Sequence, residues 1–316
     1  AGEPAPVENS AHRTALSGLH DGSVQTSSPM CGACHDIVTP GGLHLERTFA
    51  EWKTTIFGST EVAQHLSCQT CHMFATTDVV ADDPDANVPL RSYGRHEHTF
   101  AGLDVALTPW PEVEAQRDAI ARDLQPTLAP RLCVVPEGGG RIDYRLDNVF
   151  AGHMWPSGAA QDRRAWAEVV AYDAEGNVLF ASGQVPDGAD PETIDDPNLW
   201  EMRDRIFDAD GEPTHMFWDA ASYESTLLPP TVTLDMLDPR YDHSVTRSYP
   251  VIGIDTTAAR VEARVHVRPI GYDLIDDLVA SGHLDSDVRG EVPTFTLDGT
   301  ELVWTPDTDD AGHCVR

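Results

Sequence analysis

Four of the six cysteines in the chain belong to two copies of one short motif, Cys-x-x-Cys-His. The cysteines are Cys31, Cys34, Cys68 and Cys71, and the histidines that follow them directly are His35 and His72. Two thiols at this spacing can add across the vinyl groups of a haem, and the adjoining histidine can bind the iron from the proximal side. The sequence therefore predicts two haem c cofactors, one at each motif.

Paired cysteines also occur in zinc sites, in disulfides and in thioredoxin-like redox sites. Zinc ribbons place their two pairs roughly 15 to 20 residues apart, and the interval between Cys34 and Cys68 is much longer. A thioredoxin-like pair occurs once, in a βαβ unit, and needs no trailing histidine. The repeated histidine therefore favours haem over these alternatives.

The distal ligands of the two irons do not follow from the motifs. A distal methionine raises the reduction potential and a distal histidine lowers it, and the chain offers 14 histidines. We favour His98 and His153 as distal ligands, with His20 as a lesser candidate. His153 lies in a Gly- and Pro-rich loop between two expected strands, and such a loop can deliver a side chain to an iron. Candidates of lower rank are His12, His65, His96 and Met154.

The segments around the motifs predict helices and loops. Residues 45–57 are expected to form an amphipathic helix, because apolar residues recur there every three or four positions. A second helix is expected over residues 111–124. We place a dihaem cytochrome c domain, made mostly of helix and coil, over residues 1–130.

Beyond residue 130 the pattern changes to short strand-like runs separated by turn residues. The runs cover residues 141–146, 164–172, 177–182, 231–237, 244–252 and 260–267. Such a series predicts an antiparallel β-sandwich, interrupted by one helix at residues 272–281. The expected fold class is therefore α+β and multidomain, with a β-sandwich-like domain over residues 131–316 that supplies a possible distal ligand.

The two remaining cysteines, Cys133 and Cys314, lie near the two ends of the second domain. In an oxidising compartment we expect them to form a disulfide. Two unpaired thiols are the alternative.

The chain has 316 residues, of which 41% are hydrophobic, and this suits a globular protein of about two domains. No apolar run reaches the roughly 18 residues of a membrane span, so no span is expected. The sequence begins without a charged-then-apolar leader, as expected of a mature protein whose signal has been removed. Because haem c is attached outside the bacterial cytoplasm, we expect an exported protein, periplasmic or extracellular.

The formal net charge is −31, from 52 acidic against 21 basic residues, and Lys53 is the single lysine. A field of this sign repels nucleic acid and anionic membranes, so we expect neither as a partner. It favours cationic proteins, minerals or metal ions.

Several segments resemble the multihaem c-type cytochromes, the family that includes the tetrahaem electron carriers. They are the run that ends at His20, the two motifs with the intervening residues 45–53, residues 98–102, and the Gly-His-x-x-Pro-Ser-Gly run at residues 152–158. The resemblance implies electron transfer, and it implies distal ligation by His98 and His153. Family members commonly carry four or more haems, whereas this chain has two motifs.

The leading hypothesis is a dihaem electron-transfer protein with bis-histidine, low-spin haems, serving redox partner proteins or extracellular electron acceptors. The alternative is a haem enzyme with one open iron position that reduces peroxide, nitrite or another small substrate, with Asp36, Arg95 or His96 as acid or base. Histidines on the N-terminal arm, His12 and His20, also suggest head-to-tail self-association into filaments. A carbohydrate- or partner-binding role for the sandwich remains open.

Overall fold

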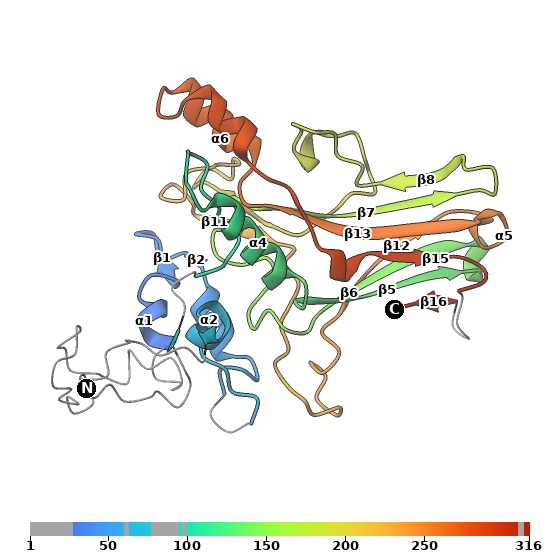
Figure 1. Cartoon of the computed structure of the whole chain (residues 1–316), viewed down its shortest axis with the longest axis horizontal. Coiled ribbons are helices and arrows are strands. Elements are labelled where there is room, and N and C mark those ends of the chain that lie inside the picture. Colours follow the sequence, from blue (N-terminus) through green and yellow to red (C-terminus); the bar gives the residue numbers. More distant parts are fainter. Residues whose placement is uncertain (1–27, 60–62, 77–94, 97–99, 309–312) are drawn as a thin grey trace.

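The computed structural model describes residues 28–59, 63–76, 95–96, 100–308 and 313–316. Its larger part is a body of antiparallel strands (Figure 1). A smaller part, which carries both Cys-x-x-Cys-His motifs and is called the motif part here, lies at one end of that body. Within the described ranges, no helix combines the length and the apolar character needed to cross a membrane.

The motif part consists of short elements. They are α1 (Ser28–Gly32), β1 (Ile37–Val38), β2 (His44–Glu46), α2 (Thr48–Lys53), α3 (Cys68–His72), β3 (Ala75–Thr76) and β4 (Arg95–His96). Its own hydrophobic cluster has three buried residues, Trp52, Ile56 and Phe57, with Phe49 and Leu66 packed against them. A fully buried side chain of this kind contributes about 1.5–3 kcal/mol, so side-chain burial stabilises the motif part only weakly.

Two antiparallel sheets form the body. The first runs in the order β12 (Val245–Pro250), β6 (Arg141–Asn148), β5 (Leu128–Val135) and β16 (Cys314–Val315). The second runs in the order β14 (Phe295–Thr296), β13 (Arg260–Arg268), β7 (Arg164–Tyr172) and β8 (Val178–Ser182), with β15 (Leu302–Trp304) paired to β13 and β9 (Trp200–Glu201) paired to β7. A separate hairpin joins β10 (Asp204–Phe207) to β11 (Ser222–Ser225). The helices of the body are α4 (Val113–Leu124), α5 (Ile254–Thr257) and α6 (Tyr272–Ala280), with 3₁₀ turns at Glu137–Gly139, Pro191–Thr193, Ser286–Glu291 and Asp298–Thr300.

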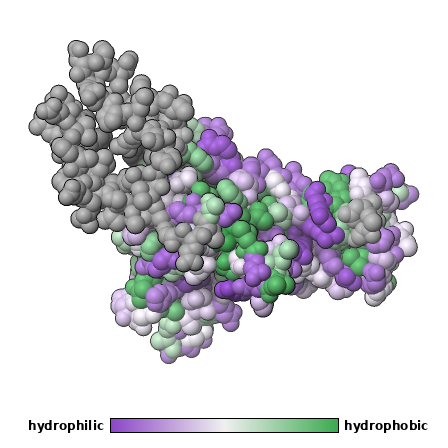
Figure 2. Space-filling model, turned by 90° about the horizontal axis from the view of Figure 1, so that it is seen from below, coloured by the Kyte–Doolittle hydropathy of each residue, from purple (hydrophilic) through white to green (hydrophobic). Residues whose placement is uncertain are grey.

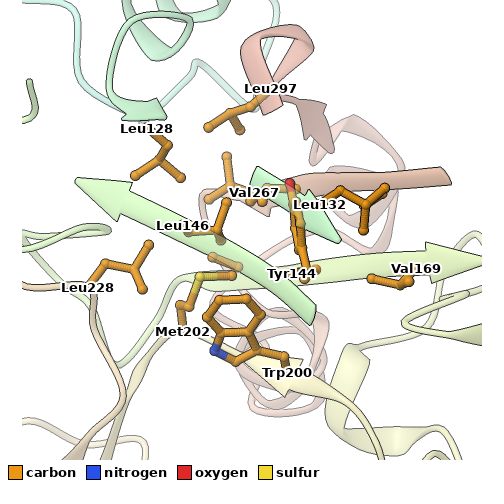
Figure 3. Packing of buried hydrophobic residues seen from close by; sticks show 14 of the residues in the cluster. Leu128, Leu132, Tyr144, Leu146, Val169, Trp200, Met202, Leu228, Val267 and Leu297 are labelled. Atoms are coloured by element: carbon orange, nitrogen blue, oxygen red, sulfur yellow. The ribbon is translucent and has the colours of Figure 1, made fainter. Parts of the chain in front are cut away.

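The two sheets share one hydrophobic core. Side chains on β6 alternate between buried and half-buried, as expected of a strand with one face on a core. Figure 3 shows Tyr144 and Leu146 of the first sheet in one cluster with Val169 and Val267 of the second. The hydroxyl of Tyr144 donates a hydrogen bond to the carbonyl of Thr300 at 2.9 Å, so its polar end is satisfied inside the core.

The segment that precedes the sheets packs on the same core. Ile120 of α4 is 1% exposed, and it shares the core cluster with Leu103 and Val105. Leu103, Val105 and Ile120 therefore pack on the core of the sheets, while Leu107 also packs against the cluster around Ile275 of α6. The division of the chain near residue 130 stays a prediction.

Most predicted elements are confirmed. The helices expected at residues 111–124 and 272–281 are α4 and α6, and five of the six strand-like runs correspond to β6, β7, β8, β12 and β13. The sequence pattern missed β5, because Pro130 suggested a break. Proline is tolerated there since, in the described residues, the β16 pairing involves only Leu132 and Cys133 of β5 and so requires no N–H from Pro130.

The strand predicted at residues 231–237 is wrong. Local side-chain bonds shape this segment instead, since the backbone N–H of Asp235 donates to the hydroxyl of Thr233 at 3.1 Å and that of Leu237 to the carboxylate of Asp235 at 2.9 Å. Such bonds compete with strand pairing. Met236 and Leu237 are 77% and 91% exposed as a result.

Figure 2 shows hydrophobic patches between hydrophilic ones on the lower face of the molecule.

The helix predicted at residues 45–57 is much shorter than expected. Its first residues form β2 and its last residues form turns, in which the hydroxyl of Thr55 accepts the backbone N–H of Phe57 at 3.2 Å and that of Gly58 at 3.3 Å. Ile56 is nevertheless buried. The apolar periodicity therefore identified the buried residues and overestimated the helix.

The predicted disulfide between Cys133 and Cys314 is confirmed, with an S–S distance of 2.06 Å. The two cysteines lie directly opposite each other on β5 and β16. The bond joins the C-terminal strand to the first sheet.

Candidate haem sites

The two motifs lie next to each other, although a long stretch of chain separates them. The backbone N–H of Cys68, at the start of α3, donates to the hydroxyl of Ser28 in α1 at 3.2 Å. The side-chain amide of Gln69 donates to the sulfur of Cys31 at 3.5 Å. We call the site at residues 31–35 the first haem site and the site at residues 68–72 the second haem site.

None of the four motif cysteines forms a disulfide. A hydrogen bond between Cys31 and Cys68 raises the pKa of Cys31 and lowers the pKa of Cys68 to about 6. Burial raises the pKa of Cys71 to about 11. One thiol of each motif thus contacts the other motif, and the thiols are available for thioether bonds.

Apolar side chains border both motifs and face solvent. Met30 precedes the first motif, Ile37 and Val38 follow it, and Phe74 follows the second motif. Their exposed fractions are 54%, 39%, 47% and 38%. Exposed apolar groups around four free thiols fit the binding of a large apolar ring such as a porphyrin.

The proximal histidine of the first haem site is held by a carboxylate. Nδ1 of His35 lies 2.8 Å from Oε1 of Glu46. Strand β1 follows the motif and pairs with β2, with Ile37 opposite Glu46, so the hairpin brings Glu46 beside His35. The other ring nitrogen, Nε2, is left for an iron.

The first motif also needs a small residue after its first cysteine. A Cβ atom at Gly32 would overlap the ring of Phe49. The backbone N–H of Phe49 in turn donates to the carbonyl of His35 at 3.0 Å. Phe49 therefore fixes the position of α2 relative to the first haem site.

The proximal histidine of the second haem site is held by a backbone carbonyl. Nδ1 of His72 lies 2.6 Å from the carbonyl oxygen of Ala101. Because a carbonyl can only accept, Nδ1 carries the hydrogen and Nε2 is free to bind a metal. The hydroxyl of Ser67 accepts the N–H of Thr70 at 3.2 Å and caps the short helix that carries the motif.

His153 lies on the loop between β6 and β7, and its ring is arranged in the same way. Nδ1 of His153 lies 2.8 Å from the carbonyl oxygen of Met154, so its Nε2 is also free. Burial lowers the pKa of His153 to about 4. The ring is therefore neutral at pH 7, which is the form that binds metals.

The rings of His72 and His153 face each other. Their centroids lie 6.3 Å apart, and the ring planes are inclined by only 8°. Two imidazoles that bind one ion from opposite faces, each through a nitrogen about 2 Å from the metal, have centroids about 6 Å apart. The separation of the two rings is compatible with this distance, so His72 and His153 are the residues that would hold an iron at the second motif.

The loop that carries His153 is held from two sides. From the body, the side-chain amide of Asn148 donates to the carbonyls of His153 at 2.8 Å and Leu228 at 3.1 Å. From the motif part, Glu51 on α2 accepts the backbone N–H of Met154 at 3.2 Å and the hydroxyl of Ser157 at 2.8 Å. These bonds fix the backbone on both sides of the histidine.

Other predicted ligands are not placed. His12, His20 and His98 lie outside the described residues, as does the side chain of His96. His65 packs against Trp52, with ring centroids 6.2 Å apart, and both of its ring nitrogens are buried without a hydrogen-bond partner. An imidazole in that state loses its hydrogen bonds to water without replacement, so His65 is a stronger ligand candidate than its place in the sequence suggested.

The residues that hold these histidines are not predictable from the sequence pattern. Glu46, Glu51 and Asn148 are ordinary polar residues in segments whose geometry the sequence does not reveal. The carbonyl of Ala101 has no signal in the sequence at all. The resemblance did mark residues 45–53 as a unit, and this unit contains both glutamates.

No protein-family model matches the chain, and no curated protein matches it by sequence. Among solved structures, a penta-haem cytochrome c552 from Thermochromatium tepidum superposes with a TM-score of 0.56 at 19% sequence identity. The chain shares the fold of a multihaem cytochrome c. The similarity covers 87% of this chain and 55% of the cytochrome, so the chain spans little more than half of that protein's length.

Proposed function

We propose that the chain is a dihaem c-type cytochrome that transfers electrons outside the cytoplasm through two bis-histidine haems. The observation that carries the proposal is the facing pair of His72 and His153, with both Nδ1 atoms bonded to carbonyls. The adjacency of the two motifs and the fold shared with a penta-haem cytochrome c552 support it.

In this function the chain keeps the second iron position closed. A bound haem supplies an iron that takes up and releases one electron. His72 and His153 would hold the iron of a haem at the second motif, and the bonds from Asn148 and Glu51 fix the backbone of the loop that carries His153. A closed site favours electron transfer, since a substrate needs an open position on the iron.

At the first haem site His35 is the proximal ligand, and the distal ligand remains a proposal. His98 and His20 are the candidates from the sequence, and His65 joins them because its ring nitrogens are buried and unpaired. A histidine from any of the three makes this site bis-histidine as well.

The partners are proposed from charge. A formal charge of −31 attracts cationic redox proteins or mineral surfaces in the periplasm or outside the cell. Self-association into filaments is a further prediction from the histidines of the N-terminal arm.

Two measurements on the purified holoprotein test the proposal. The mass of the acid-denatured chain is expected to include two haems, and the ferric protein is expected to give low-spin spectra for both. Carbon monoxide is expected not to bind the reduced protein at neutral pH. Binding of carbon monoxide at one haem would favour the alternative function, an enzyme with an open iron position. A mass without haem would contradict both the electron-transfer protein and the haem enzyme.

A further inference from the structure

We propose that Glu46 is a positioning residue that lowers the reduction potential of the first haem site by accepting a hydrogen bond from Nδ1 of His35. The inference rests on the proposed function, since it requires haem at both motifs. It concerns a residue that is not itself a ligand and that acts through the proximal histidine.

The contact between Glu46 and His35 is well defined. The distance is 2.8 Å, and the side chain of Glu46 is 15% exposed while that of His35 is 60% exposed, so the carboxylate end of the contact is the buried one. Backbone pairing of β1 with β2 sets the position of Glu46 independently of the side-chain contact. In the described part of the chain, His35 is the one ion-pair partner of Glu46.

Neighbouring charges do not take the place of this contact. Arg47, the next residue, is directed to the carboxylates of Asp204 at 3.0 Å and Glu51 at 3.6 Å. Arg47 therefore does not compete with His35 for the carboxylate of Glu46.

A carboxylate and a carbonyl have different effects on a proximal histidine. An anionic acceptor draws the Nδ1 hydrogen toward itself and leaves more negative charge on Nε2, which makes the ligand more basic. A more basic ligand stabilises ferric iron over ferrous iron, and the potential falls. His72, whose acceptor is the neutral carbonyl of Ala101, lacks this effect.

The different acceptors of the two proximal histidines are expected to give the two haems different reduction potentials, with the first site lower. Both proximal ligands are histidines, but the first site has the anionic acceptor and the second has the neutral one. The single electron of the half-reduced protein then resides mainly on the haem of the second site. An electron that enters at the first site moves downhill to the second.

The variant Glu46→Gln tests this directly in the holoprotein. Glutamine keeps the length of the side chain and an acceptor oxygen, and it removes the charge. We expect the ferric-to-ferrous ratio of the first haem at a given potential to fall about tenfold, which raises its potential by about 59 mV for one electron. The second haem, identified as the one that turns high-spin in His153→Ala, is expected to keep its potential.

The control is Glu175→Gln, which removes one charge from the exposed loop between β7 and β8. It is expected to shift neither couple, so that a general effect of net charge is separated from the contact with His35. Spectroelectrochemical titration of each variant measures both couples. Unchanged potentials in Glu46→Gln, or an equal shift of both haems, would overturn the proposal.

A loss of haem in Glu46→Gln would leave Glu46→Asp as the deciding variant. Aspartate keeps the charge on a shorter side chain, so the potential of the first haem is expected to stay close to that of the unaltered protein. A rise as large as that expected for glutamine would contradict a role for the charge. The mass of the unaltered holoprotein separates this outcome from failure of the dihaem proposal, because it counts the haems independently of their potentials.

Discussion

The proximal histidine of the first motif takes its partner from 11 residues further along the chain, within one small hairpin. That of the second motif takes its partner from 29 residues further on, and it faces a histidine on a loop of the body. Two identical motifs are thus completed in different ways. The first haem site depends on local structure, and the second depends on how the motif part meets the two sheets.

This difference predicts which amino-acid substitutions affect the first haem site and which affect the second. Alterations of the body are expected to act on overall stability or on the second site, according to how close they lie to the loop that carries His153. The following changes are ordered by the size of the expected effect on stability.

The largest effect is expected from removing the disulfide with Cys133→Ala and Cys314→Ala. The bond closes a loop with a sequence separation of 181 residues, and the chain-entropy model assigns such a loop about 5 kcal/mol. Denaturant unfolding followed by circular dichroism measures the loss. The pair lies at the end of the body away from the motifs (Figure 1), so both haem spectra of the folded protein are expected to stay unchanged.

A smaller effect is expected from Asp162→Asn. Burial raises the pKa of Asp162 to about 6, above its usual value, so the folded chain holds a proton that the unfolded chain releases. The free energy of unfolding therefore falls as pH rises from about 4 to about 6. The variant is expected to abolish this fall and to gain up to roughly 3 kcal/mol at pH 7, as urea titrations at several pH values would measure. If the free energy of unfolding of the variant depended on pH as that of the unaltered protein does, a raised pKa of Asp162 would be contradicted.

A loss of about 1–3 kcal/mol in the free energy of unfolding is expected from Asn148→Ala, because the carbonyl of His153 loses the side-chain amide as donor and that of Leu228 keeps only the backbone N–H of Trp155. The same change frees the loop at the second site. We expect a partial high-spin signal from one haem in the ferric spectrum. Equal perturbation of both haems would show that the sites are not independent.

The smallest loss in the free energy of unfolding, about 1 kcal/mol, is expected from Ser157→Ala. Its hydroxyl donates to Glu51 and lies 2.8 Å from the hydroxyl of Thr48. Loss of this contact is expected to lower the thermal midpoint slightly and to leave the potential of the first haem unaltered. A shift of that potential would mean that α2 couples the two sites.

The sequence predicted the parts of the sites that are local and chemically distinctive. The motif cysteines and histidines are recognisable from spacing, and His153 stands out in a Gly- and Pro-rich loop. The partners of the histidines were not predictable in the same way. Glu46 lay within an expected helix, and its role arises only because that segment begins as a strand paired with the residues after the first motif.

The fold was predictable where burial alternates regularly and not where local bonds intervene. Strands β6 and β13 bury every second side chain and were found from the sequence. Residues 231–237 have apolar residues of the right kind, but the side chains of Thr233 and Asp235 bond to nearby backbone and no strand forms.

The most direct test of ligation by His153 is the ferric absorption and electron paramagnetic resonance spectrum of His153→Ala beside that of His283→Ala, in which an exposed histidine in the turn after α6 is removed. Ligation by His153 predicts that one of the two haems becomes high-spin in His153→Ala while the other stays low-spin, and that His283→Ala changes neither. Two low-spin haems in His153→Ala would contradict ligation by His153, and with it the central claim about the second site.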